Sequence, residues 1–230
     1  MILAADIGGT STLLLLGEVT ARGWTVVRQS VFASQEYATF DLVLEQFLLP
    51  SDTVRVACLA VAGPVLQQRV SVTHLPWQLD SAKLAVRYGW RRAELINDFA
   101  AQAYGLPVLS AADLLTLQAG QPDKEAPQLL VGAGTGLGVA TRITCGTQIH
   151  IIASEGGHAD FAPHGAQQQA LQAALYARFG EVLLETVVSG AGLENIDAFL
   201  SVNVEEPQRS AAAISAAAQR GEAQGVAAMN

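Results

Sequence analysis

The sequence predicts an α/β protein built from two parts, and three observations lead to that prediction. Short apolar runs of strand length alternate with segments of helical periodicity over residues 1–105. After Pro107 the pattern changes to a hairpin followed by an Ala- and Gln-rich, mostly helical region. Half of the 230 residues are hydrophobic and only 15% are charged, which allows a real core and excludes a disordered polar chain.

The first part opens with three predicted strands. Met1–Ala5 is a short apolar run that stops at a Gly-Gly turn, and Thr12–Leu16 and Trp24–Val31 follow it. Apolar residues at helical spacing predict a helix over Phe40–Leu48. Val54–Val61 then has the composition of a buried strand.

Two further helices and a strand complete the first part. Asp80-Ser81 can cap a helix that runs to Tyr88 and ends at Gly89. Glu94–Asn97 is a short strand, and Asp98–Tyr104 has the composition of a helix. We expect residues 1–108 to form a small α/β lobe and residues 109–230 to belong to a larger α+β lobe.

The second part begins with a predicted strand at Leu129–Val131. Val139–Thr144 and Gln148–Ala153 predict a hairpin, and the chain beyond residue 165 is expected to be mostly helical. A loop is predicted near Glu205 to Pro207. The last predicted helix runs from Ala211 to the end, without a clear stop signal.

Charge and composition exclude several classes of partner. The net charge of -8 and the pI near 4.9 argue against DNA or RNA, which are held mainly by clustered Lys and Arg. No basic amphipathic segment or membrane-length apolar run is present, nor a basic leader of a secretory signal. Cys58 and Cys145 stand alone in strand-like segments, as expected of reduced thiols. We expect a cytoplasmic protein.

A first candidate site is the turn at Asp6-Ile7-Gly8-Gly9-Thr10. Small residues let backbone N–H groups and a Thr hydroxyl approach phosphate oxygens closely, and Asp6 could hold a hydrated Mg²⁺. The alternative is an ordinary hairpin turn with Asp as a turn residue.

A second glycine-rich turn spans Gly132 to Gly138. It does not match the dinucleotide fingerprint, because Leu137 stands where that pattern needs Gly and a hairpin follows instead of a helix. No Lys-Ser or Lys-Thr pair closes it, so it is not a Walker-type loop either. What remains is an unobstructed turn that could cradle a phosphate. Because several glycines are unfavourable for folding entropy, a functional role is favoured.

Asn97 and Asp98 lie where a strand meets a helix, a place from which side chains reach into a cleft. The Asp98 carboxylate can accept the proton of an attacking hydroxyl, and Asn97 can fix that hydroxyl by hydrogen bonding. The alternative is that Asp98 is the N-cap of the next helix.

A polar loop follows the predicted hairpin at Glu155-Gly156-Gly157-His158. Its two glycines leave room for a ligand, and Glu155 and His158 can bind two vicinal hydroxyls; a loop of solvated polar residues is the alternative. A metal site of His158, Asp160 and His164 is a weaker option, because the spacing matches no common site.

Taken in order, these motifs resemble the bacterial ATP-dependent glucokinase family, within the superfamily of sugar kinases, heat-shock chaperones and actin. The similarity runs from residue 2 to about residue 195, and Asp160 to Pro163 makes it closer than to other sugar kinases. The matching segments are Asp6 to Thr10, Thr73 to Trp77, Leu95 to Phe99, Gly132 to Val139, Ser154 to His158 and Ser189-Gly190. The resemblance implies a two-lobed, ribonuclease-H-like sugar kinase fold whose lobes close on the sugar and exclude water.

The resemblance also implies a function: phosphoryl transfer from ATP to the 6-hydroxyl of D-glucose, with Mg²⁺, by a homodimer. Asp98 would be the general base, and Asn97 would hold neighbouring hydroxyls. Three residues would bind further glucose hydroxyls: Glu155, His158 and Glu185. Two sets would serve ATP: Asp6 with Gly8, Gly9 and Thr10 for Mg²⁺ and phosphates, and Gly134, Thr135 and Gly136 as the second phosphate loop.

The sequence departs from the family at a few places. Ser11 and Leu13 stand where the family has Asn and a basic residue, and His74 stands where Asn is common. Loss of the charge at residue 13 is expected to weaken ATP use by roughly 1.5–3 kcal/mol. The family continues beyond Asn230. If these 230 residues are the whole molecule, we expect an incomplete adenine pocket and exposed apolar surface that favours association.

Two other functions remain open. The first is a truncated, catalytically inactive sugar-binding or regulatory protein, favoured by Ser11, Leu13 and the missing end. The second is a kinase for another hexose or an N-acyl sugar. The intact Asp98 and both glycine turns favour the glucokinase interpretation.

Overall fold

The computed structural model describes residues 1–21, 23–121, 123, 125–201 and 208–229. Contacts between residues divide the chain into two compact units, Met1–Gln121 and Pro122–Asn230. The division falls after the boundary predicted at residue 108. The loop predicted near Glu205 to Pro207 lies outside the described residues.

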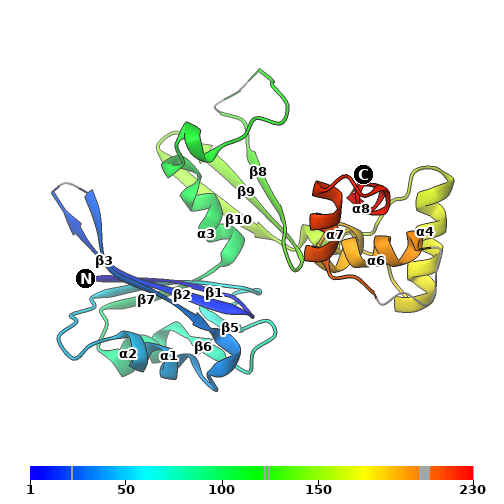
Figure 1. Cartoon of the computed structure of the whole chain (residues 1–230). Coiled ribbons are helices and arrows are strands. Elements are labelled where there is room, and N and C mark those ends of the chain that lie inside the picture. The colour runs from blue at the N-terminus through cyan, green and yellow to red at the C-terminus, as the bar shows by residue number, and fades with distance from the viewer. Residues whose placement is uncertain (22, 122, 124, 202–207, 230) are drawn as a thin grey trace. The chain divides into compact units, whose positions relative to one another are not determined.

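Unit 1 is built on a mixed sheet, which has five strands within the described residues (Figure 1). In spatial order they are β3 (Gly23–Ala33), β2 (Ser11–Thr20), β1 (Ile2–Ile7), β4 (Val56–Val61) and β7 (Arg92–Asn97). The strand β2 runs antiparallel to both β1 and β3, whereas β1, β4 and β7 are parallel. The carboxyl ends of these three parallel strands therefore meet at one edge of the sheet.

Helices cover both faces of this sheet. On one face lie α1 (Phe40–Phe47) and α2 (Ser81–Tyr88), and on the other lies α3 (Asp98–Gly105) (Figure 1). Alternate residues of the strands point to the α1–α2 side and are buried there: Leu3, Ile7, Leu14, Leu16, Leu59 and Val61. This alternation sends the side chains of the intervening residues to the α3 face.

The helix α2 has the ends that the sequence predicts. The Asp80 carboxylate accepts hydrogen bonds from the N–H groups of Ala82 and Lys83, at 3.0 and 3.2 Å. Gly89 closes the helix in the left-handed region, at φ 67°, where a residue without a Cβ is favoured. The predicted strands and α1 are also present, with ends that differ by a few residues.

A short hairpin that periodicity did not reveal crosses the α1–α2 side of unit 1. It pairs β5 (Arg69–Ser71) with β6 (Gln78–Asp80), each too short for a periodic pattern. Short 3-10 turns also occur in unit 1, at η1 (Ser34–Glu36), η2 (Leu106–Val108) and η3 (Ala111–Asp113).

Unit 2 contains the predicted hairpin, extended to an antiparallel sheet of three strands within the described residues: β8 (Gln128–Ala133), β9 (Leu137–Cys145) and β10 (Gln148–Ser154). The helical segments that follow are η4 (Gly156–His158), α4 (Gly165–Phe179), α5 (Leu184–Val187), α6 (Gly190–Leu200), α7 (Ala211–Gln219) and α8 (Ala223–Met229). A small core of Leu171, Leu175 and Val182 joins α4 to the segment after it.

The prediction of a single helix from Ala211 to the end is wrong, because a turn separates α7 from α8. Gly221 adopts φ 77°, which ends α7, and its N–H group bonds the carbonyl of Ala218 at 2.9 Å. Gly225 then lets α8 approach α7 closely, since a Cβ there would lie 2.7 Å from the nitrogen of Ala218. The Ala-rich sequence on both sides of this turn favours helix, which is why a single continuous helix was predicted.

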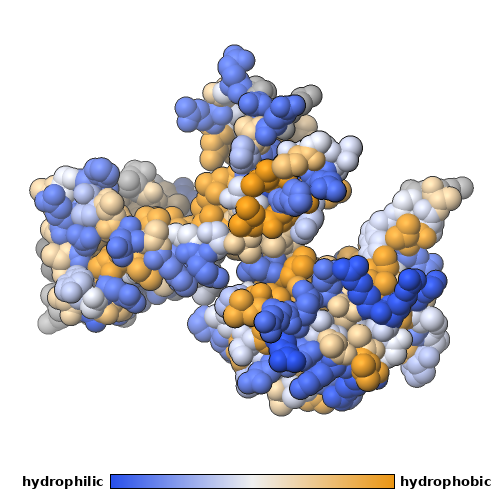
Figure 2. Space-filling model, turned by 180° about the vertical axis from the view of Figure 1, so that it is seen from behind, coloured by the Kyte–Doolittle hydropathy of each residue, from blue (hydrophilic) through white to orange (hydrophobic). Residues whose placement is uncertain are grey.

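Apolar side chains reach the surface in several places (Figure 2). Among them are Val108, Leu115 and Leu117, each more than four-fifths exposed. None of the described helices combines the length and the apolar character that a membrane crossing requires. Cys58 and Cys145 are free thiols, as expected.

Candidate active site

Two carboxylates of unit 1 share a cavity of about 310 Å³ on the α3 face of the sheet. Asp6 projects from β1 to the face opposite the core, and Asp98 is the first residue of α3, directly after β7. Because the parallel strands β1, β4 and β7 are neighbours, both carboxylates reach the same edge of the sheet. The cavity is lined by Ala4, Ala5, Asp6, Leu13, Leu15, Ala60, Asp98, Ala101 and Gln102.

Burial raises the pKa of both carboxyl groups. The effect on Asp6 comes from desolvation. For Asp98, desolvation is again the largest cause of the raised pKa, and the negative charge of Asp6 raises it further. Hydrogen bonds from the Phe99 N–H and the Asn97 side chain lower the pKa of Asp98 and so partly offset this rise. Among the described residues, no cationic side chain pairs with either carboxylate. The Asp6 carboxylate is an oxygen donor of the kind that could hold a hard cation such as Mg²⁺.

Asn97 orients Asp98 and also caps the helix. Its Nδ2 donates to Asp98 Oδ1 at 2.9 Å and to the carbonyl of Gly63 at 3.3 Å. Its Oδ1 accepts the N–H of Ala100 at 3.1 Å, which makes Asn97 the N-cap of α3. The alternative that Asp98 is the N-cap is therefore wrong, and the Asp98 carboxylate remains at the cavity.

Ser34, which the sequence motifs did not point to, stabilises the first glycine turn through hydrogen bonds. Ser34 is fully buried, and its hydroxyl donates to the carbonyl of Gly8 at 2.8 Å and bonds the hydroxyl of Thr12 at 2.9 Å. A Cβ at Gly9 would lie 3.0 Å from the carbonyl oxygen of Thr73. Gly9 thus lies at a close approach of two chain segments that a Cβ would crowd, and the Thr10 side chain is left exposed.

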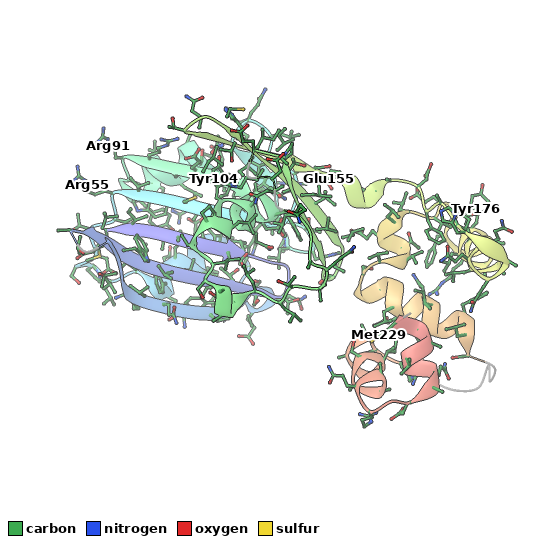
Figure 3. All side chains as sticks on the ribbon, turned by 90° about the horizontal axis from the view of Figure 1, so that it is seen from above. Arg55, Arg91, Tyr104, Glu155, Tyr176 and Met229 are labelled. Atoms are coloured by element: carbon green, nitrogen blue, oxygen red, sulfur yellow. The ribbon has the colours of Figure 1, made fainter. Side chains whose placement is uncertain are left out.

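In unit 2, three predicted sugar-binding side chains converge. His158 Nδ1 lies 3.8 Å from Glu155 Oε2, and His158 Nε2 lies 3.9 Å from Glu185 Oε1. Figure 3 shows Glu155 at the end of β10, just before η4. These separations exceed hydrogen-bond length, so donors and acceptors remain available to a polyol. All three side chains are more than one-third exposed.

The second glycine turn joins β8 to β9 and lies beside this cluster. The N–H of Gly134 bonds the carbonyl of Gly136 at 2.8 Å, and the carbonyl of Gly134 accepts the N–H of Gly190 at 2.8 Å. A Cβ added at Gly134 would meet nothing within 4 Å. Thr135 is exposed at the tip of the turn. The turn therefore leaves open space beside Gly134 and Thr135, where a phosphate could lie.

The metal alternative at His158, Asp160 and His164 is not supported. Within the described part of the chain, no group of three or more His, Cys, Asp or Glu side chains is close enough to hold a metal ion. His158 is directed instead toward the two glutamates.

Comparisons with known proteins agree on one family. The sequence pattern of glucokinase matches residues 3–230. A glucokinase of Trichormus variabilis is 40% identical over 218 residues, which cover 90% of this chain and 64% of that relative. A glucokinase of Nostoc punctiforme is 38% identical over 205 residues, covering 87% of this chain and 60% of that protein. This chain therefore spans about three-fifths of the length of the curated relatives it matches.

Solved structures extend the agreement to the fold. The crystal structure of a glucokinase from an Antarctic psychrotroph superposes with a TM-score of 0.81 at 30% identity, covering 99% of this chain and 73% of the other. That likeness confirms the predicted sugar kinase fold, and the sequence matches confirm the resemblance seen in the motifs. The chain belongs to the glucokinase family.

Proposed function

We propose that the protein phosphorylates the 6-hydroxyl of D-glucose with ATP, and that Asp98 is the general base. The observation that carries the proposal is the Asp98 carboxylate, held by Asn97 at a cavity where burial and Asp6 raise its pKa. A raised pKa makes the ionised carboxylate a stronger base toward a sugar hydroxyl. Family membership supports glucose and ATP as the substrates.

In the proposed reaction, Asp98 accepts the proton of the 6-hydroxyl while the hydroxyl oxygen attacks the γ-phosphorus of ATP. The bond between that phosphorus and the β–γ bridging oxygen breaks, and ADP leaves. Asn97 would hold a neighbouring sugar hydroxyl. Glu155, His158 and Glu185 would bind further hydroxyls and so fix which oxygen faces the phosphate.

Two glycine turns would serve the nucleotide. Gly9 and Thr10 would offer backbone N–H groups and a hydroxyl to phosphate oxygens, while Gly8, whose N–H bonds the carbonyl of Ser11, keeps that turn tight. In unit 2, Thr135 and Gly136 would offer backbone N–H groups, while Gly134, whose N–H bonds the carbonyl of Gly136, closes the second turn. Asp6 would hold Mg²⁺ through water. The cation would supply positive charge that offsets the charge on the transferring phosphoryl group.

The remaining features of the proposal rest on the sequence. The net charge of -8 supports a small-molecule enzyme that binds no nucleic acid, and the lone thiols support the cytoplasm. We further propose a homodimer, which sedimentation equilibrium on the purified chain would test: twice the chain mass supports it, and the chain mass alone refutes it.

A second candidate function is sugar binding without catalysis. It is favoured by Leu13, which lines the carboxylate cavity where the family has a basic residue. Such a protein would bind glucose but form no ADP.

The test is glucose-dependent formation of ADP from Mg-ATP by the wild-type chain and by Asp98→Asn. Loss of a general base lowers the rate by roughly 10²–10⁴-fold. A matched control is Glu94→Gln, since Glu94 is a half-exposed carboxylate paired only with Arg92 among the described residues. Activity in the wild type and the control, with loss in Asp98→Asn, supports the proposal. Equal activity in all three refutes Asp98 as the base.

A further inference from the structure

The carboxylate of Glu185 joins the second glycine turn to the polar loop. Its Oε2 accepts the backbone N–H of Leu137 at 2.7 Å, across 48 residues of chain. A Cβ at Gly136 would overlap that same oxygen, so the turn and the carboxylate are in direct contact. The N–H of Leu137 is therefore oriented by a side chain from α5 as well as by the hairpin.

The other oxygen of the carboxylate faces the polar loop. Glu185 Oε1 lies 3.9 Å from His158 Nε2, which is too long for a hydrogen bond. The polar loop also touches Leu137 directly, because a Cβ at Gly157 would overlap the Leu137 carbonyl oxygen. Leu137 thus lies between Glu185 on its N–H side and Gly157 on its carbonyl side.

The chain after Glu185 holds the far end of the same turn. Gly190 donates its N–H to the carbonyl of Gly134 at 2.8 Å. The Ser189 hydroxyl donates to the backbone carbonyl of Glu185 at 2.7 Å and accepts the N–H of Gly192 at 2.9 Å, which caps α6. The segment from Glu185 to Gly190 therefore contacts both ends of the turn.

We propose that Glu185 is a positioning residue that couples occupancy of the sugar site to the conformation of the second phosphate turn. The inference rests on the proposed function, in which Glu185 binds a sugar hydroxyl. A hydroxyl that donates to Oε1 fixes the carboxylate, and the fixed Oε2 then holds the Leu137 N–H in place. By linkage, glucose binding orders the turn and favours the nucleotide, and the nucleotide favours glucose in the same proportion.

The test is hydrogen exchange of the Leu137 amide, followed by NMR on the ¹⁵N-labelled full chain with and without saturating glucose. Glucose is expected to slow this exchange in the wild type. Glu185→Ala removes a charge-assisted hydrogen bond, so exchange without glucose rises roughly tenfold or more and the response to glucose is lost. Glu185→Gln retains an acceptor for Leu137 and keeps most of the protection. Glu181→Ala, an exposed residue four positions earlier, is the control and behaves like the wild type.

The outcomes separate this inference from the proposed function. Glucose that shifts the Gly156 and Gly157 amides but leaves Leu137 exchange unchanged refutes the coupling, while glucose binding stands. No shift at any amide at high glucose refutes both. If Glu185→Ala does not fold, Glu185→Gln decides. Its single amide oxygen holds Leu137 but leaves no acceptor for the sugar hydroxyl, so a response to glucose at Leu137 equal to that of the wild type overturns the coupling.

Discussion

The charge of Asp6 raises the pKa of Asp98, although 92 residues separate them in the chain. Both side chains line one cavity, whose other walls include Leu13 and Leu15. Leu13 lies directly opposite Asp6 in the β1–β2 register, so an apolar side chain stands beside the Asp6 carboxylate. Low local polarity and like charge together keep Asp98 a stronger base than an exposed aspartate.

Asp98→Asn is expected to stabilise the fold at neutral pH while it lowers activity by roughly 10²–10⁴-fold. A raised folded-state pKa means that ionised Asp98 opposes folding, and the neutral amide removes that penalty while its Oδ1 still accepts the Phe99 N–H. The gain should not exceed about 1 kcal/mol, because the carboxylate is only half-buried.

The stabilisation of Asp98→Asn relative to the wild type should depend on pH. The difference in free energy of unfolding between variant and wild type should be largest near pH 7. It should shrink as the pH falls through the raised pKa of Asp98, because the protonated acid is as neutral as the amide. Urea titrations from pH 7 to pH 4 measure it, and a difference that grows toward pH 4 would contradict the sign.

Leu13→Lys is expected to tighten nucleotide binding. The new ammonium would stand opposite Asp6, where it lowers the pKa of the carboxyl groups and attracts the phosphates. A charge-assisted bond of 1.5 kcal/mol or more corresponds to roughly a tenfold lower dissociation constant for Mg-ATP, measured by calorimetry. Val31→Lys, one strand further out in the same register, is the control. Equal effects of the two substitutions would show that general charge, not position, is responsible.

The glycines of unit 2 should respond differently to alanine. At Gly157 a Cβ overlaps the backbone oxygen of Leu137, so Gly157→Ala should lower the free energy of unfolding by about 1–3 kcal/mol. At Gly134 nothing lies within 4 Å, so Gly134→Ala should change stability by less than about 0.5 kcal/mol. Because that open space is where a phosphate would lie, Gly134→Ala should still raise the KM for ATP. Thermal unfolding and steady-state kinetics on both variants separate these effects.

Gln68 is expected to stabilise β7 through its side chain. Its amide pairs with both backbone groups of Leu95, at 2.8 Å to the N–H and 3.2 Å to the carbonyl. Gln68→Ala leaves these buried groups without that partner and should lower the free energy of unfolding by about 1–3 kcal/mol. Gln67→Ala is the matched control, because Gln67 also has a positive φ, 49° compared with 61° at Gln68. Similar losses in both variants would assign the effect to the backbone conformation instead.

Local patterns were enough to predict most elements of unit 1. Asp80 and Gly89 mark both ends of α2 because capping depends on residues a few positions apart. The break at Gly221 was missed, since good helix formers on both sides outweigh one glycine in a sequence pattern. The β5–β6 hairpin was missed because three-residue strands carry no measurable period.

The candidate site also could be predicted only where its features depend on residues close together in the sequence. Each polar motif was visible in the sequence because its chemistry is local. The contact of Glu185 with Leu137 and the burial of Ser34 beneath Gly8 depend on tertiary packing between distant segments, which no local pattern encodes. Asn97 caps α3 in place of Asp98 because its backbone is still extended, at φ −65° and ψ 147°, and its side chain accepts the N–H of Ala100.

Whether Asp98 acts as the base is tested most directly by measuring glucose binding and glucose 6-phosphate formation on the same preparations. Calorimetry gives the dissociation constant for glucose, and ³¹P NMR follows the product from Mg-ATP. We expect wild type and Asp98→Asn to bind glucose within about threefold of each other, with product formation at least roughly 100-fold slower in the variant. Product formation at equal rates in both proteins would contradict the assignment of Asp98.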